Sequence, residues 1–106
     1  MYVRMTFFKV KDGKMAELRE LYNDRVIPAH KQHKGIRFVH LLECLDNKSD
    51  GISVTAWDTK ADLDSYEKSG EYDKLKGMFA HLYQGEPSLK SFEVTASSEP
   101  ILLRLF

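Results

Sequence analysis

The stretch Gly51–Gly70, GISVTAWDTKADLDSYEKSG, decides the fold. Its first half, ISVTAW, alternates between two sides with the period of two that is typical of a pleated strand. Asp58 interrupts that alternation, and the spacing of Thr59 and Asp62 resembles a capping box at the start of a helix. Gly70 suits the left-handed position that ends a helix. The stretch therefore predicts a strand that turns directly into a helix.

The segments before this stretch predict a strand and then a helix. Tyr2–Val10 carries apolar residues on both sides, which is typical of a strand covered on both faces. From about Lys14 to Ile27 apolar residues recur at helical spacing. Because the residue before a proline disfavours the helical conformation, Pro28 predicts the end of this helix. Ala29–Gly35 is then expected to be a polar connector.

The remaining segments complete the order of elements. Ile36–Leu45 predicts a strand, and the short polar loop Asp46–Gly51 predicts antiparallel pairing with the strand that follows. A second helical stretch is expected from about Glu71 to Tyr83, and a last strand over Ser88–Ala96. The order βαββαβ predicts an α+β, ferredoxin-like fold with a four-stranded antiparallel sheet.

Right-handed crossovers in this order place both helical stretches on one face of the sheet. The other face is apolar, and a monomer rarely exposes a large apolar patch to water. We therefore expect two copies to pair face to face as a homodimer. The domain is expected over residues 2–96, followed by an apolar C-terminal tail over residues 97–106.

Length and charge narrow the class of protein. The chain has 106 residues, enough for one domain, and its 16 Lys and Arg balance its 16 Asp and Glu. A neutral chain has no general attraction for nucleic acid or anionic lipid, so neither partner is expected. No apolar run approaches the ~20 residues of a membrane span, and the charged start is not typical of a signal peptide. We expect a cytoplasmic protein.

The sequence does not indicate a metal site. Cys44 is the only cysteine, which excludes an intrachain disulfide and a cysteine zinc cluster, and its apolar neighbours predict burial. His30 and His33 have the spacing that could offer two imidazoles to one metal. Their lysine-rich surroundings and the preceding Pro28 favour a solvated connector instead.

Several segments together resemble the antibiotic biosynthesis monooxygenase family, within the dimeric α/β-barrel superfamily. They are VRMTFFKV followed by KDGK, the helix ending in VIP, KGIRFVHLLE, and SVTAWDTKADLDSYEKSGEY. The resemblance covers roughly residues 2–96. It implies a pocket between helices and sheet, and the oxidation of a small flat phenolic, quinol or polyketide-like substrate by dioxygen without a cofactor.

The resemblance also suggests which side chains face that pocket. Arg4, Thr6 and His40 are the candidates to bind or deprotonate a substrate hydroxyl. Trp57 and Tyr66 would pack against the substrate ring, and His81 is a further substrate-binding candidate. Each has a structural alternative. The aromatic residues and the histidines could have purely structural roles in the packing of the domain. A buried Arg4 needs either a carboxylate of the protein, which would be structural, or an anionic ligand. Strand parity leaves open whether Trp57 or Ala56 faces the helices.

A neighbouring branch of the superfamily degrades haem with an Asn, a Trp and a His. Their positions correspond to Thr6, Tyr66 and Lys76 here, so none of the required residues is present. Haem degradation is therefore not expected, and we expect no cofactor. Two other functions remain open, a non-catalytic small-molecule binder and an isomerase or lyase acting on a small carbonyl compound.

Overall fold

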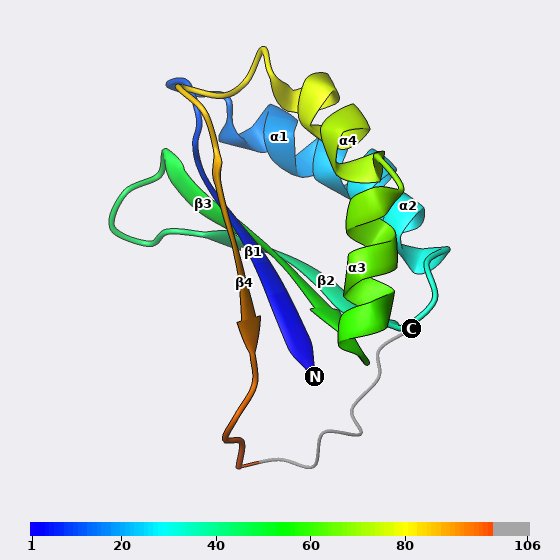
Figure 1. Cartoon of the computed structure of the whole chain (residues 1–106). Helices are drawn as coiled ribbons and strands as arrows, with labels where there is room; N and C mark the ends of the chain where they lie inside the picture. Colours follow the sequence, from blue (N-terminus) through cyan, green and yellow to red (C-terminus); the bar gives the residue numbers. More distant parts are fainter. Residues whose placement is uncertain (99–106) are drawn as a thin grey trace.

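The computed structural model describes residues 1–98 (Figure 1). Its elements confirm the predicted order of strands and helices, and they are β1 (Tyr2–Lys9), α1 (Met15–Leu21), the π-helical segment η1 (Tyr22–Val26), α2 (Ile27–Lys31), β2 (Ile36–Glu43), β3 (Asp50–Trp57), α3 (Lys60–Lys68), α4 (Glu71–Phe79) and β4 (Ser88–Glu93). The last strand ends three residues earlier than its alternation predicts. Most of the predicted apolar tail, from residue 99 onward, lies outside the described residues.

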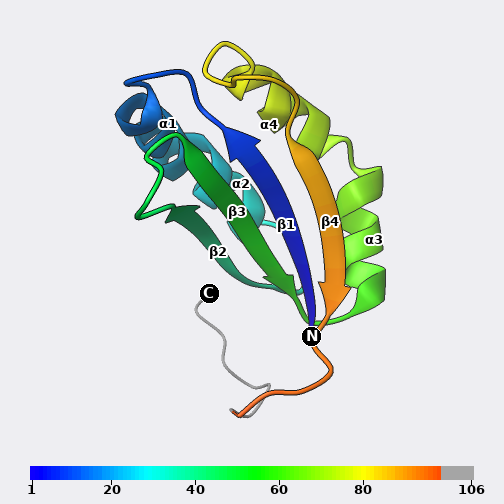
Figure 2. The same cartoon turned by 90° about the vertical axis from the view of Figure 1, so that its left-hand side faces the viewer.

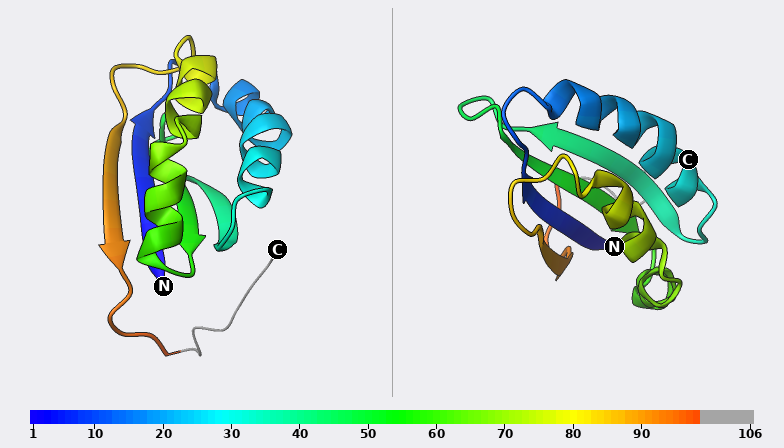
Figure 3. Two further views of the ribbon diagram at one scale, coloured as in Figure 1. Left: turned by 45° about the vertical axis from the view of Figure 1, so that its right-hand side comes forward. Right: turned by 90° about the horizontal axis from the view of Figure 1, so that it is seen from above.

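The four strands form one antiparallel sheet in the order β2-β3-β1-β4. All helices lie on one face of this sheet, and Figure 2 views the opposite, outer face. In Figure 3 the two helical stretches, α1 to α2 and α3 to α4, run side by side over this face of the sheet. This is the predicted ferredoxin-like arrangement. Among residues 1–98 no helix is both long and apolar enough to cross a membrane.

The junction between β3 and α3 forms as the sequence predicts. The backbone N–H of Asp62 donates to the Thr59 hydroxyl at 3.1 Å, which satisfies one of the unpaired donors at the helix start. Gly70 has φ +80° and separates α3 from α4. A left-handed residue at this point lets the second helix start in a new direction.

The first helical stretch does not end at Pro28, and this prediction is wrong. The helix widens into a π-helical turn at Tyr22–Val26, where the N–H of Ile27 donates to the carbonyl of Tyr22 five residues back. Pro28 then lies in the first turn of α2, where a missing N–H costs little. The predicted polar connector is consequently helical as far as Lys31.

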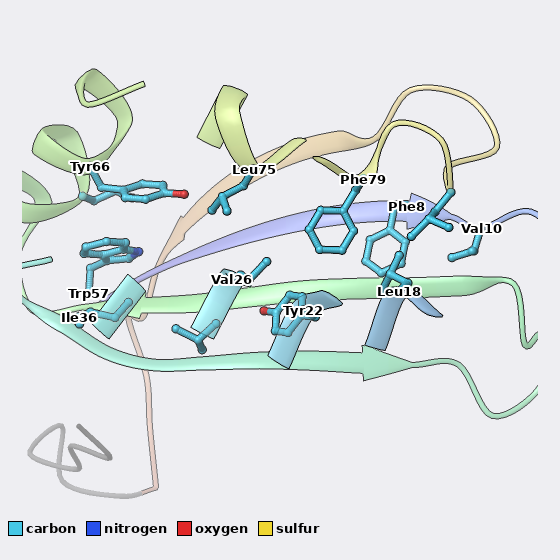
Figure 4. Packing of buried hydrophobic residues seen from close by; sticks show 13 residues of the cluster. Phe8, Val10, Leu18, Tyr22, Val26, Ile36, Trp57, Tyr66, Leu75 and Phe79 are labelled. Atoms are coloured by element: carbon cyan, nitrogen blue, oxygen red, sulfur yellow. The ribbon is translucent and has the colours of Figure 1, made fainter. Parts of the chain in front are cut away.

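The hydrophobic core fills the space between the sheet and the helices (Figure 4). Trp57 faces the helices and is fully buried beneath Tyr66, whereas Ala56 faces the outer side of the sheet. This resolves the parity that the sequence leaves open. Cys44 is exposed just beyond the end of β2, so its predicted burial is wrong.

Candidate functional site

A cavity lies between the sheet and the helices and is lined by side chains from β1, β3 and every helical segment. Its floor comes from β1 and β3, where the pairing Arg4 with Thr55 and Thr6 with Ser53 puts four polar residues on the helix-facing side. The space open to small molecules is about 50 Å³, enough for a few waters. Tyr72, which also lines it, is half-buried.

Arg4 is the charged group of this floor, and its side chain is only 5% exposed. Its guanidinium carbon lies 4.6 Å from the ring centre of Tyr72 and 5.3 Å from that of Tyr66. Both distances suit cation–π attraction. The nearest carboxylate oxygen, on Glu67, is 3.5 Å from Nη1, which makes no hydrogen bond with any described residue. A buried cation therefore faces the cavity incompletely satisfied.

His30 supplies a neutral imidazole to the same cavity. Its Nδ1 lies 2.8 Å from the carbonyl of Val26, so Nδ1 carries the proton and Nε2 keeps the lone pair. Burial is the largest cause that lowers the pKa of His30 to about 4, and the neighbouring charges of His33 and Arg4 add to it. At neutral pH His30 is therefore a hydrogen-bond acceptor and a candidate proton acceptor.

Aromatic rings form the wall around His30. Tyr66 lies with its ring centre 4.8 Å from that of His30 and 5.0 Å from that of Trp57. His33 packs edge-on against Tyr66 at 5.0 Å, and its Nε2 lies 3.8 Å from a carboxylate oxygen of Glu71. Burial raises the pKa of the Tyr66 hydroxyl, which therefore stays protonated. Such a wall can hold a flat ring by stacking.

Tyr22 lines the cavity near β3. Its hydroxyl lies 2.8 Å from the Ser53 hydroxyl and donates to the backbone carbonyl of His40 at 3.0 Å. Burial raises the pKa of Tyr22 to about 12, so the phenol remains neutral. These bonds tie the π-helical turn to the sheet and hold one wall of the cavity in place.

Three predicted site residues line the cavity, namely Arg4, Thr6 and Tyr66. Trp57 lies behind Tyr66, where its indole N–H donates to the Thr55 hydroxyl at 2.9 Å. Trp57 thus supports the wall from within the core and does not form part of the lining.

The other two predicted residues lie elsewhere, and the structure corrects their expected placement. His40 is exposed on the outer face, because it alternates with the buried Val39, and its ring stacks on Phe38 at 4.4 Å. His81 follows α4 on the side away from Phe79 and Leu82, so its side chain is 63% exposed. Its Nε2 lies 3.3 Å from a carboxylate oxygen of Glu17.

The comparisons with known proteins agree with this architecture. The sequence profile described as antibiotic biosynthesis monooxygenase matches residues 1–77, which is most of the chain. The chain belongs to the antibiotic biosynthesis monooxygenase family. Comparison with curated proteins finds no match.

Solved structures share the fold of this family member at low sequence identity. A candidate antibiotic biosynthesis monooxygenase from Deinococcus radiodurans superposes with a TM-score of 0.78 at 15% identity, covering 95% of this chain and 99% of that one. One from Nitrosomonas europaea gives 0.74 at 16%, covering 91% and 100%. A MhuD variant with two manganese protoporphyrin IX molecules in each active site gives 0.74 at 20%, covering 94% and 100%.

This family member lacks the axial histidine that the resemblance implies for a haem-degrading site. Lys76, at the position expected for the axial histidine, lines the cavity and pairs with Glu86 at 2.7 Å. That contact raises the pKa of Lys76, and a protonated amine has no lone pair for iron. Within residues 1–98 no three His, Cys, Asp or Glu side chains are grouped to hold a metal ion.

Sequence reasoning missed His30, which it places in a solvated connector. A signal was present, because Leu18, Tyr22, Val26 and His30 follow one another at intervals of four. That interval keeps residues on one helical face. Pro28 instead predicts a helix end before His30. The π-helical turn that lets the helix continue past Pro28 cannot be foreseen from the spacing of neighbouring residues.

Proposed function

We propose that this family member is a cofactor-independent monooxygenase that acts on a small hydroxylated aromatic, quinol or polyketide-like substrate. The observation that carries the proposal is the cavity itself. The cavity contains a proton acceptor, His30, whose tautomer is fixed by its hydrogen bond. It also contains a buried cation, Arg4, and an aromatic wall that includes Tyr66. In such chemistry the substrate supplies the electrons, and the protein binds it, takes its proton and excludes water.

His30 and Arg4 are suited to complementary tasks. Nε2 of His30 would accept the proton of a substrate hydroxyl, and Arg4 would stabilise the oxyanion that remains. The low pKa of His30 limits its basicity in the empty cavity. A negative charge nearby favours the protonated imidazole, so the developing oxyanion would raise that pKa toward neutrality. Transfer of the proton would thus be favoured only when substrate is present.

The cavity must widen to admit a ring. Its open space of about 50 Å³ is smaller than the ~150 Å³ apolar cavity that holds benzene. Two lining side chains, Lys76 and Tyr83, are only half-buried and can rotate outward. The fully buried residues His30 and Tyr66 would keep their positions.

Oxygen uptake tests the function. Purified protein is assayed with a panel of quinols and naphthols, alongside His30→Asn and His81→Asn. Loss of a general base lowers the rate about 10²-fold or more, so we expect this loss for His30→Asn and an unchanged rate for His81→Asn. His81 is the matched control because it is an exposed histidine outside the cavity.

The outcomes separate the three functions. Oxygen consumption that requires His30 supports the oxygenase. Tight binding without turnover would instead indicate a non-catalytic binder. Proton exchange on a small carbonyl compound without oxygen uptake would indicate an isomerase or lyase, since His30 and Arg4 could stabilise an enolate equally well.

We also infer that the protein is a homodimer formed through the outer face of the sheet. Val3, Val54 and Ala56 form a buried cluster on this face. Around them Phe7, Leu42 and Phe92 are 36–46% exposed in the single chain. Pairing two such faces removes this apolar surface from water and gives a two-fold interface. The near-zero net charge does not oppose the association.

A further inference from the structure

The buried guanidinium of Arg4 has a bonding capacity that the described residues do not use. Nη1 is shielded from solvent and makes no hydrogen bond with them. Glu67 lies within ion-pair range at 3.5 Å, but its side chain is 42% exposed, so solvent weakens its attraction. The faces of Tyr66 and Tyr72 attract the cation without accepting its N–H bonds. A buried donor in this state is costly unless a ligand completes it.

The charge of the cavity lining has one sign. Its described residues include two cations, Arg4 and Lys76, and no aspartate or glutamate. Lys76 is paired with Glu86, which is mostly exposed, whereas Arg4 is the cation on the buried floor. His30 is neutral there and presents an unprotonated nitrogen. Electrostatically, such a lining prefers a negative ligand over a neutral one of the same shape.

We propose that the cavity binds its ligand as a planar aromatic oxyanion, with one oxygen on Nη1 of Arg4 and its ring against Tyr66 and Tyr72. Arg4 is then the residue that selects for charge, and the tyrosine rings select for flatness. The proposal rests on the proposed function only for the location of the site. It narrows the substrate class to hydroxylated aromatics that also carry a carboxylate or an acidic phenol. That acidic group enters as the anion on Arg4, and the proton that His30 accepts comes from a second hydroxyl.

Calorimetric titration under nitrogen tests this with two pairs of probes that match in shape and differ in charge. Benzoate is compared with benzamide, and 4-nitrophenolate with 4-nitroanisole. We expect the anion of at least one pair to bind about tenfold more tightly or better, because a hydrogen bond to a charged donor contributes that much. The pair that responds distinguishes a carboxylate ligand from a phenolate.

Variants assign the preference to its residue. Arg4→Gln is expected to bind anion and neutral probe equally, and Arg4→Lys to keep a reduced preference. Arg19→Gln is the matched control, since Arg19 is an exposed arginine paired with Glu43 away from the cavity, and it should keep the full preference. Lys76→Gln should also keep it. If Arg4→Gln does not fold, Arg4→Lys takes its place in the comparison.

Three results would overturn the inference. They are equal binding of both members of each pair by the unmodified protein, a preference that survives Arg4→Gln, and a preference that is lost only in Lys76→Gln. Because oxygen is excluded, the result does not depend on turnover. A protein that selects anions but consumes no oxygen would disprove the oxygenase and leave this inference standing. A protein that consumes oxygen but does not select anions would support the oxygenase and overturn this inference.

Discussion

Protonation of His30 should make the stability of this protein depend on pH in a way that one substitution removes. Burial holds the pKa of His30 at about 4 in the folded chain, against an ordinary value of 6.5. The unfolded chain therefore binds this proton first as the pH falls. The free energy of unfolding keeps the His30 contribution above about pH 6.5 and loses it progressively toward about pH 4.

The magnitude follows from the two pKa values. Each tenfold change in proton affinity corresponds to about 1.4 kcal/mol, so the whole transition removes roughly 3 kcal/mol. About 1.4 kcal/mol of this should already be lost at about pH 5.5. For a domain of this size a change of 1 kcal/mol moves the Tm by about 4–8 °C, so the effect is large enough to measure.

The assay compares urea unfolding of the unmodified protein and His30→Asn between about pH 7.5 and pH 4, at one protomer concentration. Asparagine can still donate to the Val26 carbonyl but carries no titrating ring. Carboxylates titrate in both proteins, so the difference between the two curves isolates His30. We expect the free energy of unfolding of the unmodified protein to fall by roughly 3 kcal/mol more than that of His30→Asn over this range, because only the unmodified protein carries the titrating imidazole.

The matched control is His81→Asn, whose histidine is exposed and whose curve should follow that of the unmodified protein. Parallel curves for the unmodified protein and His30→Asn would refute the reasoning. They would mean that the folded chain accommodates a charged His30 at no cost, and that the cavity is wetter than its geometry indicates.

Further substitutions test other parts of the structure. Gly35 and Gly70 both have φ near +80°, but a Cβ at Gly35 would collide with Asp62, whereas a Cβ at Gly70 would meet open space. Gly70→Ala should therefore lower the free energy of unfolding in urea by about 1 kcal/mol, and Gly35→Ala should lower it clearly more. Equal losses for the two variants would contradict the collision. Thr59→Ala removes the cap of α3 and should lower the free energy of unfolding by about 1 kcal/mol, with an unchanged value arguing against the cap. Phe92→Lys puts a charge on the outer face of the sheet and should change the sedimenting species from dimer to monomer. Leu45→Lys is the control and should leave the dimer intact, because Leu45 is 96% exposed in the loop after β2. An unmodified protein that sediments as a monomer would disprove the dimer.

Several elements could be predicted because their signals are local. The alternation of ISVTAW places β3, and the Thr59–Asp62 spacing places the start of α3, since each depends on residues a few positions apart. The apolar pattern of Tyr2–Val10 predicts a strand, and β1 forms over Tyr2–Lys9 with apolar residues on both faces. That its outer face is covered stays a prediction. From such segments the order βαββαβ and the family resemblance follow.

The candidate site could be predicted only in part. Arg4, Thr6 and Tyr66 were expected to face a pocket and do line it, although their chemical roles remain proposals. His40 was misplaced because the strand carries apolar residues on both faces, so its composition does not identify the inner one.

By itself the sequence determined the order of the strands and helices, the fold class and the family of this chain, because backbone periodicity and helix caps are set by neighbouring residues. Only the tertiary structure decided that His30 enters the cavity through a π-helical turn and that Arg4 is buried with an unused donor. Both depend on which distant segments meet across the core. The burial and the hydrogen-bond partners of His30 and Arg4 are set by contacts between segments far apart in the sequence, so no short stretch of residues determines them alone.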